Sequence, residues 1–276
     1  MDKKKTSAFA ELLKFPGQIY QNRKLIFELA KNDFKTKYAG SYLGIIWAFV
    51  QPVVTVMVYW FVFGLGFRSG DVMDAPFVLW LIVGIIPWFF FSDAWNGGTS
   101  ALIVYQYLVK KVVFQIDILP LVKVISAVFV HAFFVLFAAI LQFGYGYGPD
   151  IYMIQALYYS FCAFVLALGL SYITSAIVVF FKDLTQIIGI ILQVGVWMTP
   201  IMWSMDTMNL PGWIQFVLKL NPMYYVVYGY RDAFIHKVWF WENPAQTVYF
   251  WVLTLFILGT GIASFKKLKV HFADVL

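Results

Sequence analysis

The sequence predicts an all-α integral membrane protein with six transmembrane helices. Of its 276 residues, 62% are hydrophobic and 12% are charged, whereas a soluble domain has about 45–50% apolar and about 25% charged residues. Charge-free runs recur along the chain, each longer than the roughly 20 residues that a helix needs to cross the hydrocarbon core. We therefore expect spans at about 42–66, 76–97, 122–143, 152–181, 184–203 and 246–265.

The basic residues indicate which ends of these spans face the cytoplasm. If the N-terminus is inside, 16 Lys and Arg lie on inner segments and four lie on outer ones. Because cytoplasmic segments carry the excess of basic residues, we expect a multi-pass protein with both termini cytoplasmic. The net charge of +6 then acts as a topology signal and attracts anionic lipid, so no nucleic-acid partner is expected.

Residues 1–37 form a segment distinct from the membrane domain at 38–276. The segment lacks the apolar core and cleavage site of a signal peptide, so we expect it to be retained. Its apolar clusters alternate with charges, and Leu25, Ile26 and Leu29 fall at helical spacing. This pattern predicts amphipathic interfacial helices on the cytoplasmic membrane surface, with a solvated tail as the alternative.

The outer segment at about 206–243 contains two apolar pieces, 207–218 and 220–230. A helix of about 12 residues reaches only about 18 Å, which is too short to span. Asn221 before Pro222 is an N-cap followed by a first-turn proline. These features predict re-entrant half-helices before the last span, sheltered by protein or by a water-filled vestibule.

The sequence VWMTPIMW closes the fifth predicted span and contains Pro200, which ends or bends a helix. Met198 and Met202 are four residues apart, so on a continuous helix they share one face and form an adaptable apolar gate. Trp197 and Trp203 flank this gate. As the alternative, both tryptophans are interfacial anchors.

Tyrosines cluster in the outer segment, where Tyr224 and Tyr228 fall on one helical face and Tyr225 lies beside them. Flat aromatic rings suit the apolar faces of sugars, so these residues are candidates for a substrate path. Packing in an interfacial aromatic belt is the alternative.

The motifs of several enzyme classes are absent from the sequence. It contains no GxxxxGK[ST] phosphate-binding loop, no HExxH and no GxSxG. His131, His236 and His271 are scattered, so no metal site is expected and no cofactor is assigned to this chain. Asp93, near the inner end of the second span, either contacts a polar substrate or caps its helix.

Two cytoplasmic segments are candidates for partner contacts. The loop at 105–121 is too polar to span and too apolar for a plain linker, and Lys182 and Asp183 form a tight turn between two long apolar runs.

Six segments and the tail carry a family resemblance, in order: KYAGSYLGIIWAFVQPVVTVMVYWFVF (37–63), VGIIPWFFFSDA (83–94), KKVVFQIDILPL (110–121), FFKDLTQIIGIILQVGVWMTPIMW (180–203), NPMYYVVYGYRD (221–232) and HFADVL (271–276). With them the chain resembles permease subunits of polysaccharide-exporting ABC transporters, and most closely the wall teichoic-acid translocation permeases of Gram-positive bacteria.

The resemblance implies a homodimer in the bacterial cytoplasmic membrane that pairs with two ATP-binding subunits, which hold the ATP and magnesium. It implies a translocation path between the two copies, built from spans one, two and five, and a glycan carried on undecaprenyl diphosphate as substrate. Its coupling residues would be Lys110, Lys111, Gln115, Asp117, Lys182 and Asp183. Many members have proline where this chain has Gln115, which predicts a more helical coupling turn here.

The resulting hypothesis is a transport subunit that exports lipid-linked glycan, with wall teichoic acid as the first candidate. An O-antigen or capsular polysaccharide exporter is the alternative in the same class. An intramembrane glycosyl- or acyltransferase is a different class, and it would need a cluster of acidic, His or Arg residues at one membrane face. A passive channel is a third reading, against which the two coupling candidates argue.

Overall fold

The computed structural model describes residues 17, 19–66, 70–72, 75–110, 115–205, 208 and 210–276. Within this part of the chain, five helical segments are long and apolar enough to cross a membrane: Gly44–Gly66, Phe77–Thr99, Ile116–Gly144, Ile151–Val178 and Pro244–Val275. A sixth apolar helix, α9 (Leu184–Met198), has 15 residues and so reaches only about 22 Å. The described residues hold no strand longer than the isolated bridge between Val72 and Ala75.

The described elements are, in chain order, α2 (Arg23–Lys37), η1 (Gly44–Ile46), α3 (Trp47–Tyr59), the π-helix η2 (Trp60–Gly66), α4 (Phe77–Thr99), α5 (Ala101–Val104), α6 (Gln106–Val109), η3 (Ile116–Ile118), α7 (Leu119–Gly144), η4 (Ile151–Ile154), α8 (Gln155–Val178), α9, α10 (Gly212–Lys219), α11 (Pro222–Arg231), the π-helix η5 (Asp232–His236), η6 (Phe240–Glu242), α12 (Pro244–Leu268), η7 (Lys269–His271) and α13 (Phe272–Val275). Five predicted spans are confirmed as apolar helices of spanning length.

The fifth predicted span, 184–203, is wrong at its outer end because α9 stops at Met198. Thr199 is extended, with φ −94° and ψ 125°. A residue that precedes proline is pushed out of the helical region, and Pro200 itself offers no N–H to continue the helix. The predicted effect of this proline on the helix is therefore confirmed.

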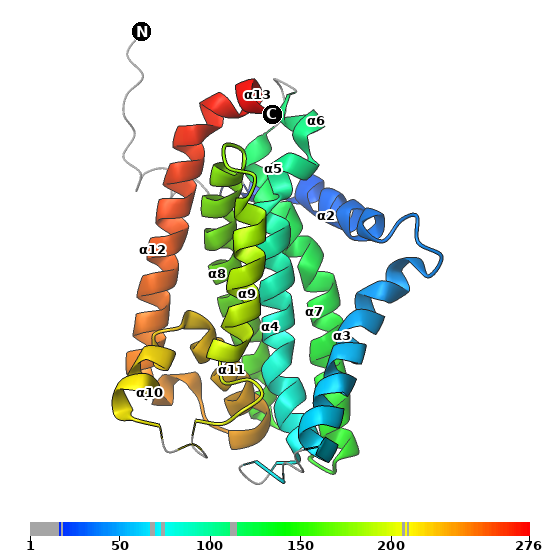
Figure 1. Ribbon diagram of the computed structural model, residues 1–276, viewed down its shortest axis with the longest axis vertical. Coiled ribbons are helices and arrows are strands. Elements are labelled where there is room, and N and C mark those ends of the chain that lie inside the picture. The colour runs from blue at the N-terminus through cyan, green and yellow to red at the C-terminus, as the bar shows by residue number, and fades with distance from the viewer. Residues whose placement is uncertain are drawn as a thin grey trace.

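The predicted cytoplasmic and outer segments lie at opposite ends of the bundle. Figure 1 shows α2, α5, α6 and α13 at one end, with α10 and α11 towards the other. The turn between α8 and α9 is at the same end as α13 (Figure 1). This arrangement agrees with the charge pattern, while the direction of the bundle across the membrane stays a prediction.

The centre of the bundle consists of α4 and α8, which α7, α11 and α12 surround. Helices α8 and α12 approach closely at Gly169 and Gly261. A Cβ on Gly261 would stand 2.6 Å from the carbonyl oxygen of Gly169, so only glycine fits there. Small residues at helix contacts are the usual solution inside membranes, where close packing replaces the hydrophobic effect.

Two helices are less embedded than this centre. Along α3 the buried residue is Ala48, and along α9 the buried residues are Ile188 and Leu192. Figure 1 shows α3 leaning away from the bundle at the end that joins α2. These two helices therefore present long apolar faces outward.

Residues 23–37 form a packed helix, so the alternative of a solvated tail is wrong for this part of the segment. Helix α2 turns Ile26, Ala30 and Asp33 inward, and its Phe27 and Phe34 rings contact Phe129 of α7. Of the residues predicted at helical spacing, Ile26 is 2% exposed and Leu25 is 43% exposed.

The outer segment forms two short helices, as predicted. Helix α10 has 8 residues and α11 has 10. Asn221 caps α11 because its side chain accepts a hydrogen bond from the Met223 N–H at 3.0 Å, and Pro222 occupies the first turn. Neither helix is long enough to cross a bilayer.

Candidate functional site

A buried arginine forms hydrogen bonds with the backbone that follows α9. Arg231, the last residue of α11, is fully buried, and its two terminal nitrogens donate hydrogen bonds to the carbonyl oxygens of Pro200 at 2.7 Å and Ile201 at 2.8 Å. Asn221 donates from Nδ2 to Thr199 Oγ1 at 2.8 Å. Helix α11 thus supplies donors to carbonyls that a broken helix leaves without intrahelical partners.

Arg231 also contacts the centre of the bundle. Its guanidinium carbon lies 3.5 Å from the centroid of the Trp80 ring in α4, and such cation–π contacts stabilise a charge that burial removes from water. Gly84, one turn further along α4, leaves the space for the guanidinium, because a Cβ there would stand 2.7 Å from Nη2. From the charge distribution, the sequence analysis counts Arg231 only as one of the outer basic residues and does not predict that it is buried. Its position inside an aromatic run is the sequence feature that indicates burial.

The predicted methionine pair does not share a helical face, because α9 ends at Met198. Met198 is 49% exposed, whereas Met202 is 4% exposed and belongs to the main core. Trp197 is 52% exposed, and its carbonyl accepts a hydrogen bond from Trp203 Nε1 at 3.1 Å. The spacing argument for a gate is therefore wrong, while the role of these four residues stays a prediction.

The three candidate tyrosines point in two directions. Tyr224 and Tyr228 stack with ring centroids 4.2 Å apart, which confirms that they share a face of α11. Both line an outer cavity of about 340 Å³ together with Lys219, Asp232 and Glu242. Tyr225 instead turns into the bundle, where its hydroxyl shares hydrogen bonds with those of Tyr158 and Thr247, each at 3.0 Å. Tyr224 and Tyr225 are 5% and 6% exposed, and the substrate-path role of all three tyrosines stays a prediction.

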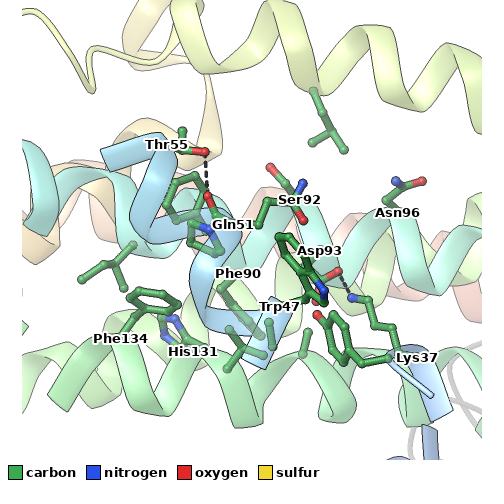
Figure 2. A pocket seen from close by; sticks show the side chains of 18 of the residues that line it. Lys37, Trp47, Gln51, Thr55, Phe90, Ser92, Asp93, Asn96, His131 and Phe134 are labelled. Atoms are coloured by element: carbon green, nitrogen blue, oxygen red, sulfur yellow. Dashed lines mark hydrogen bonds and ion pairs between the residues drawn. The ribbon is translucent and has the colours of Figure 1, made fainter. Parts of the chain in front are cut away.

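A second cavity, of about 470 Å³, lies between α3, α4 and α7 and touches α9. Figure 2 shows side chains from these first three helices around it, including Gln51 of α3, Ser92 of α4 and His131 of α7. Lys37, at the end of α2, forms an ion pair with Asp93 at its rim. Neither predicted role of Asp93, a substrate contact or a helix cap, anticipates this ion pair.

The ion pair at the rim affects the pKa of the Lys37 amine. Burial opposes the charge on Lys37, but the Asp93 carboxylate outweighs this effect and raises the pKa of the amine above its usual 10.5. Lys37 therefore stays protonated at physiological pH.

His131 is buried at the middle of α7 and joins three helices. Its Nε2 lies 2.9 Å from Ser160 Oγ of α8 and 2.9 Å from Tyr230 Oη of α11, and its ring stacks on Phe90 of α4 with centroids 4.5 Å apart. The described residues contain no group of His, Cys, Asp and Glu that could hold a metal ion.

The predicted coupling residues fall into two places at the α13 end of the bundle (Figure 1). Asp117 forms an ion pair with Lys269 of the C-terminal segment, and Gln115 accepts a hydrogen bond from Asn22 at 2.8 Å. Lys182 and Asp183 are exposed in the turn between α8 and α9.

The remaining two coupling candidates are adjacent in the chain. Lys110 is exposed just after α6, and Lys111 lies outside the described residues. Gln115 itself has no regular helical conformation; the 3₁₀ turn begins at Ile116. The expected more helical turn is therefore not found at Gln115.

A buried ion pair that the sequence pattern misses anchors α2 at the same end. Asp33 is 4% exposed, accepts a hydrogen bond from Tyr105 at 2.7 Å and pairs with Lys123 of α7 at 2.6 Å. Burial, together with the hydrogen bond to Asp33, raises the pKa of the Tyr105 hydroxyl well above its usual value. Tyr105 thus remains a donor to the carboxylate even in alkaline solution.

Comparison with known proteins gives extensive matches. The chain is 28% identical over 264 residues to an O-antigen export system permease protein of Myxococcus xanthus, a match that covers 95% of this chain and 99% of that protein. An O-antigen export system permease protein of Klebsiella pneumoniae is 27% identical over 256 residues, or 91% and 95% of the two chains. The polysialic acid transport protein of Escherichia coli is 22% identical over 235 residues, or 85% and 89%.

These names correct the substrate preference drawn from the sequence segments. They refer to O-antigen and polysialic acid, so they support the O-antigen or capsule alternative better than the teichoic-acid reading. The closeness to teichoic-acid permeases is not supported.

The family described as ABC-2 type transporter matches residues 24–235. This range runs from α2 to η5. It includes the cavity residues of α3, α4 and α7, the end of α9 at Met198, and the short helices α10 and α11. The chain therefore belongs to the ABC-2 type transporter family.

Proposed function

We propose that the protein is the membrane subunit of an ATP-driven exporter that moves a lipid-linked polysaccharide outward across the bacterial cytoplasmic membrane. The observation that carries this proposal is the nearly full-length similarity to O-antigen export permeases. The bundle also supports it, because a wall of apolar helices closed by short outer helices suits a passage that must remain sealed when empty.

The substrate we propose is an O-antigen or capsular type of glycan on undecaprenyl diphosphate. The relatives that transport O-antigen and polysialic acid support this choice over teichoic acid. Aromatic pairs such as Tyr224 and Tyr228 can stack on sugar rings when the passage is occupied and on one another when it is empty.

The working assembly we propose contains two copies of this chain and two ATP-binding subunits. The outward apolar faces of α3 and α9 support pairing of two copies, because exposed residues on them include Met57, Val58, Ile190 and Val194. The ATP and magnesium belong to the separate subunits, which we place at the end that holds α13. That end is cytoplasmic in the orientation that the basic residues favour.

The direct test is to purify the chain with candidate ATP-binding subunits and to measure ATP hydrolysis with and without lipid-linked glycan. We expect a stable complex whose hydrolysis rate rises with the glycan. Failure to form any ATP-hydrolysing complex overturns the proposal.

The coupling residues we propose are Lys110, Lys111, Gln115, Asp117, Lys182 and Asp183. The exposure of Asp183 in a tight turn at the α13 end supports its contact with an ATP-binding subunit. Asp183→Ala and Lys111→Ala should retain hydrolysis and lose export.

Asp274→Ala and Lys267→Ala are matched controls, because both side chains are exposed near the same end and lie outside the proposed contact. Normal export by the Asp183→Ala and Lys111→Ala variants removes the coupling assignment.

A further inference from the structure

The cavity beside α3 has a polar lining although its walls are apolar helices. Its wall includes Gln51 and Thr55 of α3, Ser92 and Asn96 of α4, and His131 of α7. These side chains belong to three apolar helices of spanning length. Polar groups at such positions are costly in hydrocarbon, so they indicate a cavity that receives something polar.

Two atoms in this wall have no hydrogen-bond partner within the described part of the chain. They are Ser92 Oγ and His131 Nδ1, and neither has accessible surface in this conformation. His131 is 5% exposed, and its other ring nitrogen is already engaged with Ser160 and Tyr230. Because a buried polar atom left unsatisfied costs about 1–3 kcal/mol, such atoms in native proteins normally meet water or a ligand.

The charge in the cavity is balanced. Lys37 and Asp93 are the charged residues that line it within the described part of the chain, and they pair with each other. Behind the wall, Lys123 is likewise paired with Asp33. No lining cation is left over for a phosphate or a carboxylate, so the electrostatics favour a neutral ligand over an anionic one.

The hydrogen-bonding groups suit hydroxyls. The amides of Gln51 and Asn96 each donate and accept, Ser92 does the same, and Asp93 accepts. Sugar hydroxyls also donate and accept. Trp47 is 43% exposed at the cavity and adds an aromatic face, and the volume of about 470 Å³ lies in the range of small-molecule sites, about 300–1,000 Å³.

The cavity has a defined outer limit. Beyond Ile86, Phe89 and Phe134, which line both spaces, the groove between α3, α4 and α7 continues as a space of about 260 Å³ lined by apolar side chains alone. A hydroxyl-rich ligand finds no partner there. A sugar that enters from the Lys37 end is therefore held at the polar part in this conformation.

We propose that this cavity is a saccharide subsite for a neutral, hydroxyl-rich sugar unit, with Gln51, Ser92 and Asn96 as the contacting residues. The inference rests on the proposed export of glycan. It narrows the class of substrate, since it assigns neutral sugars rather than polyol phosphates to this position in each subunit. Ser92 reaches the sugar by rotation of its hydroxyl, while His131 keeps its place between Ser160 and Tyr230.

The test uses the purified full-length chain in lipid nanodiscs and saturation-transfer difference NMR. Probes are neutral tetrasaccharides of glucose, galactose, mannose and rhamnose, with a glycerol phosphate tetramer as the anionic counterpart. We expect saturation transfer to at least one neutral probe and none to the glycerol phosphate. Equal or stronger binding of the anionic probe overturns the assignment, and so does a cavity that holds water only and binds no probe.

Variants locate the binding. Gln51→Leu and Asn96→Leu should each weaken binding of the neutral probe at least threefold, because each replaces an amide by an apolar side chain of similar size. Gln106→Leu and Asn32→Leu are the matched controls, since both residues are exposed at the α2 and α6 end and neither lines the cavity. Thr55→Trp, which fills the cavity, should abolish the signal.

Ser92→Ala is a smaller change, and it serves as the test if the leucine and tryptophan variants do not fold. A normal elution profile with weaker probe binding supports the site, and unchanged binding in all four variants removes it. The ATP hydrolysis assay separates the two proposals. A complex stimulated by glycan but insensitive to these variants leaves the export function standing and overturns only the subsite.

Discussion

Arg231 and Pro200 lie 31 positions apart in the chain, and the guanidinium of one donates to the carbonyl of the other at 2.7 Å with the arginine fully buried. The contact joins the last turn of α11 to the backbone where α9 has ended. One side chain therefore fixes the position of a short outer helix relative to a broken membrane helix.

Arg231→Met should lower the free energy of unfolding by about 3 kcal/mol, because two carbonyls lose their donors in a buried place. Arg231→Lys should recover part of this loss, since one ammonium cannot reach both carbonyls in the same fork geometry. The measurement is thermal unfolding in detergent. Lys219→Met removes an exposed cation nearby as a control, and an equal effect of the two methionine variants contradicts the assignment.

Gly84→Ala should destabilise the protein by about 1–3 kcal/mol through overpacking against Arg231. A Cβ there would stand 2.7 Å from Nη2 and 3.3 Å from Cζ. Gly189→Ala in α9 is the control, because nothing lies within 4 Å of its Cβ position. We expect the control to be neutral or slightly stabilising in the same unfolding assay, since alanine favours helix over glycine.

Asp33→Ala should cost about 3–5 kcal/mol, because it leaves the amine of Lys123 inside the protein without its carboxylate. Lys123→Met should cost a similar amount, and the double variant less than the sum of the two. Unfolding of the single and double variants in detergent measures this coupling energy. Additive effects of the two changes contradict a direct ion pair.

Met198 and Met202 should respond differently to truncation. Met202→Ala should cost about 2–3 kcal/mol of stability because its side chain is buried in the core, whereas Met198→Ala should leave the unfolding temperature unchanged. Ion leak through vesicles that contain the double variant tests the gate. Unchanged leak and unchanged export together exclude a methionine gate.

Local features of the fold are predictable from the sequence, and long-range contacts are not. The effect of Pro200 on its helix and the cap at Asn221 depend on backbone geometry within a few residues, so both predictions are confirmed. Spans of sufficient length depend only on hydrophobicity and are equally predictable. The aromatic run around Arg231 is a local sign of burial, but its partners Trp80 and Gly84 lie on another helix, and the sequence does not identify them.

The candidate site shows the same division. Stacking of Tyr224 on Tyr228 follows from their spacing on one helix. The shared face of Met198 and Met202 fails because the spacing rule holds only while the helix continues. The polar cavity beside α3 joins residues of several helices, and the sequence singles out Asp93 among them as a candidate substrate contact without revealing its neighbours.

The glycine contact between α8 and α12 has a mechanical consequence. Backbones that touch at Gly169 and Gly261 cannot slide without collision, so these two helices move as one stiff body. Helices α3 and α9 have few buried side chains to displace. Helices α3 and α9 can therefore be displaced with the loss of fewer packing contacts than the joined pair α8 and α12.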